Sequence, residues 1–450
     1  MKKLMSVLLA LALVLSLNVA AMAANMNASG EDTGVAGAWE TADTPIPQDK
    51  TINIKKELLS YNATSQSVFA PAFSYVYTVT PADVSGKTVT DETSDHESGV
   101  AVANVPVKQG ITTGLKVNNG ASGSATSAVG YLDFTNATVL TTSAAGGSNT
   151  YNITLDFTGV TFPQAGVYRY QVAETITKAD HTTTVTYDNI AIKDASGTNP
   201  NTRWLDVYVD GTGAIYGYVC MAANDSVTPS TTKTNGFVTG STGADKYYTY
   251  DLELSKLVNN DTYAKNSHPF PFTVIFKNTK NYSTTYTITE TTDTGSTGIT
   301  PAAASAPTWS GVAKVKDGVA ITYTGIPAGV DVDVYETNDM SGVTYTVVTT
   351  VNGTDGTPDN NVSWGTAPAT ATPQATTKAA YESTKATVDT KDITDTTPTT
   401  DKQTLKITNT LLLISPTGVV LRIAPYVLIL VGGIALLLVS RRRKAASEEE

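Results

Sequence analysis

The chain of 450 residues has few of the side chains that most enzyme and metal sites need, with one cysteine and three histidines. One Cys excludes an internal disulfide framework, and so few Cys and His residues cannot build a Cys/His metal site. Charged residues make up only 16%, and the formal net charge is −11. Such a surface does not suit a nucleic acid, because phosphate binding needs a clustered excess of Lys and Arg. We therefore expect no enzyme, no metal, no cofactor and no nucleic-acid partner.

Residues typical of β-structure are abundant instead, including 22 Tyr and a large share of Thr and Val. Apolar and polar residues alternate with period 2 throughout the chain, and no amphipathic helix of three turns is found. The sequence predicts an all-β protein. The first set of expected strands covers residues 73–79, 151–157, 168–172, 205–209 and 214–220. The second set covers residues 250–254, 270–276, 282–288, 319–323, 330–334 and 405–407.

The two sets repeat each other. Ala-Gly-Val-Tyr-Arg-Tyr-Gln-Val-Ala-Glu at 165–174 corresponds to Ala-Gly-Val-Asp-Val-Asp-Val-Tyr-Glu at 328–336, and each copy follows an apolar residue and a proline. This favours two β-sandwiches in tandem, whose arrangement resembles immunoglobulin-like and CnaB-like domains. The expected limits are 25–50 for a leading linker, 51–245 for the first domain and 246–410 for the second, with a Thr-rich insertion at 350–403.

The two ends of the chain carry export and anchoring patterns. Residues 1–24 have two lysines, an apolar run and Ala-Met-Ala, which is typical of a signal peptide. Residues 419–440 are apolar enough for a transmembrane helix. Three arginines and a lysine open the tail at 441–450, which places that tail in the cytoplasm. The simplest interpretation is an exported protein with a single membrane span.

A short motif directly precedes the apolar segment, in the region 411–418. It consists of Ile414, Ser415, Pro416, Thr417 and Gly418. Pro-Thr-Gly outside an apolar helix and a basic tail resembles the cell-wall sorting signal of Gram-positive bacteria. The resemblance implies that a sortase cleaves between Thr417 and Gly418 and transfers Thr417 to an amine. A permanent membrane anchor is the alternative.

Three strands of the second domain each end an apolar face with a polar residue. These residues are Lys256, Glu336 and Asn409, and each is in phase with apolar residues two and four positions earlier. Buried charges are too costly to stand alone, so the three groups should lie close together or at the rim of the sandwich. Ordinary polar strand ends are the alternative.

The three groups also suit a cross-linking reaction. Burial makes Lys256 lose its proton more easily and makes Glu336 keep its proton. A neutral Lys256 can attack the carboxamide carbon of Asn409, while Glu336 polarises the carbonyl and relays protons as ammonia leaves. The product is an amide between the first and last strands of the domain.

The order of motifs resembles that of the backbone pilins of Gram-positive bacteria, especially the streptococcal T-antigen type. The motifs are a strand lysine, Gly-Val-x-x-x-Val-x-Glu at 329–336, Ile-Thr-Asn at 407–409 and the Pro-Thr-Gly that follows. The resemblance implies an isopeptide bond formed by Lys256 and Asn409 and promoted by Glu336. It also implies a structural subunit of a sortase-polymerised pilus on the cell wall, made from a transient membrane-anchored precursor. Its partners would be a sortase, other copies of the chain, minor pilins and peptidoglycan. A monomeric wall-anchored adhesin that binds a host or carbohydrate ligand is the alternative.

The first domain repeats part of this pattern. Lys56 and Glu174 end apolar faces in the same way, but the acceptor stays open. The spacing found in the family indicates Asp245, which would react with loss of water, whereas strand phase with Phe237 favours Asn235.

The resemblance also implies a lysine near the end of the first domain that attacks the sortase-held Thr of the next subunit. Lys233 is the nearest match by position, and Lys246 is the rival.

Overall fold

The computed structural model describes most of the two expected domains. The described residues are 50–64, 66–84, 88–89, 105–197, 199–209, 211–223, 229–239, 243–278, 285–298, 308–337, 343–363, 385–388, 402–412, 429–431, 433–436 and 438. Several predicted segments lie outside them: the signal peptide at 1–24, the linker at 25–50 except residue 50, the sorting motif at 414–418 and the tail at 441–450. The described residues of 419–440 are helical, but no helix in the described part of the chain is long and apolar enough to cross a membrane.

The prediction of an all-β protein is confirmed. Alternation explains the strands directly: in β1 (Thr51–Tyr61) every second residue is buried, and the inward set consists of Ile52, Ile54, Lys56, Leu58 and Ser60. This is the period of a strand with one face on a core. Among the described elements, helix is limited to the 3₁₀ turn η2 (Tyr187–Ile190) and to α2 (Thr262–Ser267), apart from the helical residues beyond 428.

In the described part of the chain, fifteen strands precede residue 240. They are β1, β2 (Val68–Phe69), β3 (Phe73–Pro81), β4 (Thr88–Val89), β5 (Val105–Gln109), β6 (Lys116–Val117), β7 (Ala128–Phe134), β8 (Val139–Leu140), β9 (Gly147–Asp156), β10 (Gly166–Thr177), β11 (Ile192–Lys193), β12 (Thr202–Val209), β13 (Ile215–Ala223), β14 (Pro229–Lys233) and β15 (Gly236–Phe237).

The remaining strands follow from residue 245 onward. They are β16 (Asp245–Asn259), β17 (Phe270–Asn278), β18 (Thr289–Thr292), β19 (Thr308–Val315), β20 (Ala320–Pro327), β21 (Val330–Glu336), β22 (Thr344–Val351), β23 (Thr354–Asp355), β24 (Asp359–Ser363), β25 (Ala386–Val388) and β26 (Gln403–Leu411).

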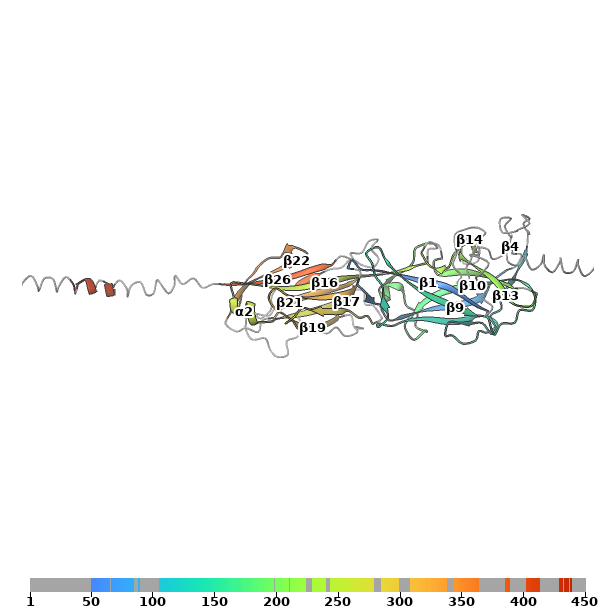
Figure 1. Cartoon of the computed structure of the whole chain (residues 1–450), viewed down its shortest axis with the longest axis horizontal. Helices are drawn as coiled ribbons and strands as arrows, with labels where there is room; N and C mark the ends of the chain where they lie inside the picture. Colours follow the sequence, from blue (N-terminus) through green and yellow to red (C-terminus); the bar gives the residue numbers. More distant parts are fainter. Residues whose placement is uncertain are drawn as a thin grey trace, which may run out of the picture.

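A single sheet of 12 strands runs through both halves of the molecule, with β23-β22-β26-β16-β1-β9-β6 as its main order. The first half of this sheet faces an 8-stranded sheet ordered β14-β13-β12-β10-β3-β7, and the second half faces a 4-stranded sheet ordered β19-β17-β21-β25. Figure 1 shows the two sandwiches end to end in an elongated molecule. The apolar inner faces form one continuous core cluster along both sandwiches.

The strand β16 belongs to both sandwiches. Its first residues pair in parallel with β1, where Leu58 is opposite Asp245, and its last residues pair in parallel with β26, where Val258 is opposite Asn409. The expected limit between residues 245 and 246 therefore falls at the start of an unbroken strand. The domain limits themselves stay a prediction.

A buried hydrogen-bond network joins the two sandwiches beside the middle of β16. The carboxylate of Asp251 is 2% exposed, and its Oδ1 accepts from Asn62 Nδ2 at 2.9 Å and from the Gly325 amide at 3.1 Å. Thr64 donates to the other oxygen. Because these partners come from both halves of the molecule, the network fixes one half against the other.

Two expected segments differ from the structure. The strand expected at 282–288 is not found in its described part, 285–288, and β18 begins only at Thr289. Period-2 alternation predicted that strand, but in this region β20 pairs only with Thr289–Thr292. The range 350–403 is more than a surface insertion, because β23, β24 and β25 lie inside it and pair with β22 and β21.

Candidate functional site

Lys256, Glu336 and Asn409 meet in the core of the second sandwich. Lys256 Nζ lies 2.8 Å from Glu336 Oε2, and Asn409 Nδ2 donates to Glu336 Oε1 at 2.6 Å. All three residues are at most 2% exposed. Phe270 and Phe272 cover the amine, with ring centroids 4.4 and 5.7 Å from Nζ. We call Lys256, Glu336 and Asn409 the second cluster.

Strand pairing explains why residues so distant in sequence come together. Lys256 on β16 is opposite Ile407 on the parallel strand β26, so Asn409 lies on the same inner face and slightly farther along. Glu336 ends β21 in the facing sheet and reaches across the core. The apolar floor supplies the low dielectric that makes the geometry chemically important.

Burial sets the electrostatics of the second cluster. It lowers the pKa of Lys256 to about 8, although Glu336 acts in the opposite direction. At neutral pH the unprotonated fraction of Lys256 is therefore much larger than that of an exposed lysine. The carbonyl oxygen Oδ1 of Asn409 accepts no hydrogen bond from the described residues. The arrangement combines a lysine that readily loses its proton, a carboxyl group and a carboxamide in a dry pocket.

Lys56, Glu174 and Asp245 form a corresponding group in the first sandwich, which we call the first cluster. Lys56 Nζ lies 2.8 Å from Glu174 Oε1 and 2.7 Å from Asp245 Oδ2. The side chains of all three are fully buried. Burial acts to lower the pKa of Lys56, but Asp245 and Glu174 outweigh it, so the pKa lies above the ordinary value.

The structure brings Asp245, and not Asn235, to Lys56. Asp245 is opposite Leu58, two residues beyond the lysine, just as Asn409 is opposite Val258 in the second cluster. Asn235 is half-buried, and its backbone carbonyl accepts from the Lys55 amide at 2.7 Å. Because Gly236 is opposite Lys55, Asn235 lies on the same edge of β1 but before the level of Lys56, whereas Asp245 lies beyond it.

Two carboxyl groups share the first cluster, and this shapes their protonation. Burial raises the pKa of Glu174 to about 7, against the effect of Lys56 and with a further contribution from Asp245. Glu174 is therefore partly protonated near neutral pH. A carboxylic acid that keeps its proton can act as an acid or relay protons.

Hydroxyl and amide donors surround the first cluster. Tyr75 donates to Asp245 Oδ2 at 2.6 Å, Tyr77 donates to Glu174 Oε2 at 2.8 Å, and the Ala195 amide donates to Asp245 Oδ1 at 2.9 Å. The sequence analysis did not identify these residues. The signal was present at the tyrosines, because a Tyr on the inward face of a predicted strand needs a partner for its hydroxyl.

The two candidate polymerisation lysines lie in different settings. Lys233 ends the short strand β14 and is half-buried, opposite Met221. Lys246 lies in β16, opposite Leu59 and Lys193, next to the first cluster. Figure 1 shows β14 in the half of the molecule away from β26 and α2.

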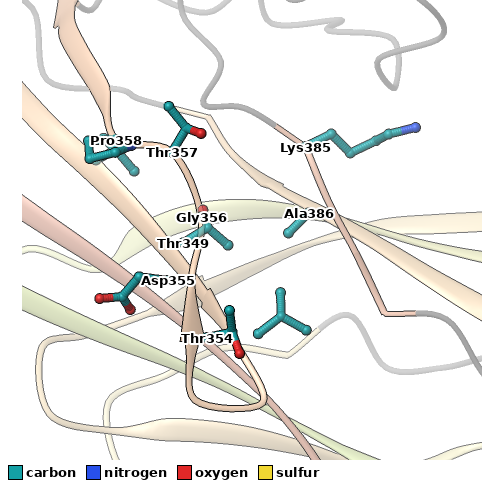
Figure 2. A pocket seen from close by; sticks show the side chains of 10 residues that line it. Thr349, Thr354, Asp355, Gly356, Thr357, Pro358, Lys385 and Ala386 are labelled. Carbon is teal, nitrogen blue, oxygen red and sulfur yellow. The ribbon is translucent and has the colours of Figure 1, made fainter.

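A surface pocket of about 410 Å³ lies along β22, and one of its lining residues, Val347, is opposite Asn409 in the ladder. Figure 2 shows its lining, in which Asp355 and Lys385 are the charged residues. None of the residues predicted from the sequence lines it. The described residues also contain no group of three or more His, Cys, Asp and Glu side chains that could hold a metal ion.

Comparison with known proteins gives structural matches only, since no protein-family profile and no curated protein sequence matches the chain. The major pilin T-13 from Streptococcus pyogenes is 16% identical, with 81% of this chain and 99% of that chain covered and a TM-score of 0.33. A second Streptococcus pyogenes major pilin is 18% identical, with 79% and 98% covered and a TM-score of 0.35. The pilus-presented adhesin Cpa is 15% identical, with 47% and 37% covered and a TM-score of 0.23.

The chain thus matches T-antigen major pilins over about four fifths of its length at low sequence identity. At this identity and TM-score the matches assign no function.

Proposed function

We propose that this protein is the structural backbone subunit of a covalent surface pilus, stabilised by one self-generated amide bond in each sandwich. The observation that carries the proposal is the matched pair of buried clusters. Each has a lysine, a glutamate in the facing sheet and an acceptor on the neighbouring parallel strand. An ion pair that served stability alone gains little from such burial, because desolvation offsets the attraction.

The reaction in the second cluster joins Lys256 Nζ to the carboxamide carbon of Asn409 and releases ammonia. Glu336 contacts both partners, so it can take a proton from the amine and deliver one to the leaving nitrogen. In the first cluster Lys56 joins Asp245 and releases water, with Glu174 in the corresponding role. Fixed geometry replaces a separate enzyme, because the reacting groups are held in contact.

Intact-mass measurement tests both bonds at once. The Lys256–Asn409 bond removes about 17 Da and the Lys56–Asp245 bond about 18 Da, so the exported chain should weigh about 35 Da less than its sequence. Lys256→Ala should abolish only the loss of about 17 Da, and Lys56→Ala should abolish only the loss of about 18 Da. A parent chain at its full sequence mass would exclude both bonds.

Polymerisation is the second part of the proposal. A sortase would recognise Ile414 to Gly418, hold Thr417 and transfer it to Lys233 of another copy, and the last subunit would be joined to peptidoglycan. The position of β14 in the half away from the end of β26 supports a head-to-tail fibre (Figure 1).

The polymer is tested on wall extracts boiled in detergent. The parent should give a ladder of high-mass species, and Lys233→Ala should collapse it to a single band. Lys246→Ala is the matched control and should leave the ladder unchanged. A ladder that survives Lys233→Ala and is lost with Lys246→Ala would assign the role to Lys246. A single band in the parent would favour a monomeric wall-anchored adhesin.

A further inference from the structure

The two clusters differ in their acceptor, and they differ again in the aromatic residues that cover them. On the strand next to each glutamate, Tyr77 is directly opposite Glu174, and Phe272 is directly opposite Glu336. The positions are therefore equivalent by register, although the residues differ by a hydroxyl group.

The aromatic residue two positions earlier follows the same rule. It is Tyr75 in the first sandwich and Phe270 in the second, and each ring lies closest to its lysine, at 4.2 and 4.4 Å from Nζ. An Asp acceptor thus occurs with two tyrosines, and an Asn acceptor occurs with two phenylalanines.

We propose that Tyr75 and Tyr77 determine the acceptor of the first cluster by making that cluster suitable for an aspartic acid. The phenylalanines of the second cluster suit an asparagine instead. This inference rests on the proposed cross-linking function. Tyr75 is the main specificity residue because its hydroxyl contacts the acceptor itself, at Asp245 Oδ2. Tyr77 acts through Glu174, so it is a positioning residue.

The need for these hydroxyls follows from counting hydrogen-bond acceptors. Replacing a carboxamide by a carboxylate removes two N–H donors and leaves oxygens that only accept. In a dry core each of those oxygens needs a donor. The first cluster provides them: Tyr75 and Lys56 at Oδ2, and the Ala195 amide at Oδ1 of Asp245.

The same donors also assign the two oxygens different roles in the reaction. The bond from Lys56 Nζ to Asp245 Cγ forms, and the Cγ–Oδ2 bond breaks. The ammonium gives up two protons, both finish on Oδ2, and this oxygen leaves as water. Oδ1 stays on the backbone amide of Ala195 and becomes the carbonyl oxygen of the new amide.

Tyr75 holds Oδ2 while charge develops on the acceptor and is itself unchanged at the end. A preorganised donor of this kind can contribute roughly 10²-fold to the rate. Phe270 and Phe272 have no hydroxyl to offer, and Asn409 Oδ1 accepts no hydrogen bond from the described part of the chain. Those phenylalanines leave the second cluster with a glutamate as the single proton relay.

The test measures cross-link formation in the full chain by intact mass at intervals after a short induction. Tyr75→Phe should slow the loss of about 18 Da by roughly 10² if the hydroxyl acts as a preorganised donor. The loss of about 17 Da from the second cluster should keep its parental rate, which shows that the molecule has folded. Phe is the appropriate replacement because the second sandwich holds Phe270 at the equivalent position.

A change of acceptor separates chemistry from packing. Asp245→Asn alone and Asp245→Asn with Tyr75→Phe should form the first cross-link at similar rates, with loss of about 17 Da. Slowing by the same factor in both acceptor backgrounds would show that Tyr75 acts by packing and would overturn the inference. An unchanged rate for Tyr75→Phe with Asp245 present would also overturn it, while the cross-links themselves would remain established.

Discussion

Removing the acceptor of the second cluster, by Asn409→Ala, separates the covalent bond from the contacts around it. Without an acceptor, Lys256 stays an amine 2.8 Å from Glu336. The substitution deletes the proposed amide, which in the parent takes the place of the 2.6 Å hydrogen bond from Asn409 to Glu336, because that nitrogen leaves as ammonia. Few other core contacts change, because Ala keeps the backbone of β26 in the ladder.

The expected loss of stability comes mainly from the unfolded chain. The amide between Lys256 and Asn409 closes a loop of 409 − 256 = 153 residues. By the loop-entropy relation used for disulfides, that closure contributes about 5 kcal/mol. For a domain of this size, that loss lowers the melting temperature by about 10 to 20 °C.

Calorimetry combined with intact mass measures the effect. The variant should melt earlier and should lack the mass loss of about 17 Da. Asn259→Ala is a matched control on the exposed face of β16, where the side chain donates a hydrogen bond to Thr410. Asn259→Ala should keep both the mass loss and the parental melting temperature. The entropic reasoning would be refuted if the parent carried the amide and yet had the same melting temperature as Asn409→Ala.

Three further predictions concern protonation and the joint between the sandwiches. Glu174→Gln should abolish the first cross-link. In the parent, this bond should form more slowly as pH rises through the Glu174 pKa of about 7, because the acid form is lost. Intact mass after synthesis at several pH values checks both expectations, and a pH-independent rate would contradict them. In Asn409→Ala the folded pKa of Lys256, about 8, lies below the unfolded value of 10.5, so only the unfolded chain keeps this proton between those pH values. Stability relative to the cross-linked parent should then rise by about 3 kcal/mol between pH 8 and 10.5 in urea titrations, and a constant difference would argue against it. Asp251→Ala should lower the free energy of unfolding by about 3 kcal/mol, because it leaves two buried N–H donors without their acceptor. It should also broaden the solution scattering profile. Unchanged scattering and stability would show that the joint does not depend on this carboxylate.

Strand alternation predicted much of the molecule, because burial on one face repeats at every second residue. It identified five polar residues as inward-facing, and all five are buried. They are Lys56, Glu174, Lys256, Glu336 and Asn409. Alternation could not predict that these groups contact one another, because it fixes the face on which a residue lies but not its neighbour in another strand.

The acceptor of the first cluster shows where counting fails. Lys56 is opposite Phe237, yet the next inward ladder position, opposite Leu58, belongs to Asp245 and not to Thr239. The chain leaves the ladder after Phe237 and returns six residues later than an unbroken strand would. Strand phase is lost across such an excursion, whereas the spacing found in the resembling family includes it and indicated Asp245.

The shared strand β16 also sets an order of events as the chain emerges with its N-terminus first. Its leading residue Asp245 can complete the first cluster at once, because Lys56 and Glu174 have already emerged. Lys256, eleven residues later on the same strand, must wait until Asn409 has emerged. During that interval the first residues of β16 are paired in the finished first sandwich, while the edge of β16 that later pairs with β26 is unpaired. The finished first sandwich then acts as a template that holds the register for the second, so the molecule matures in one direction.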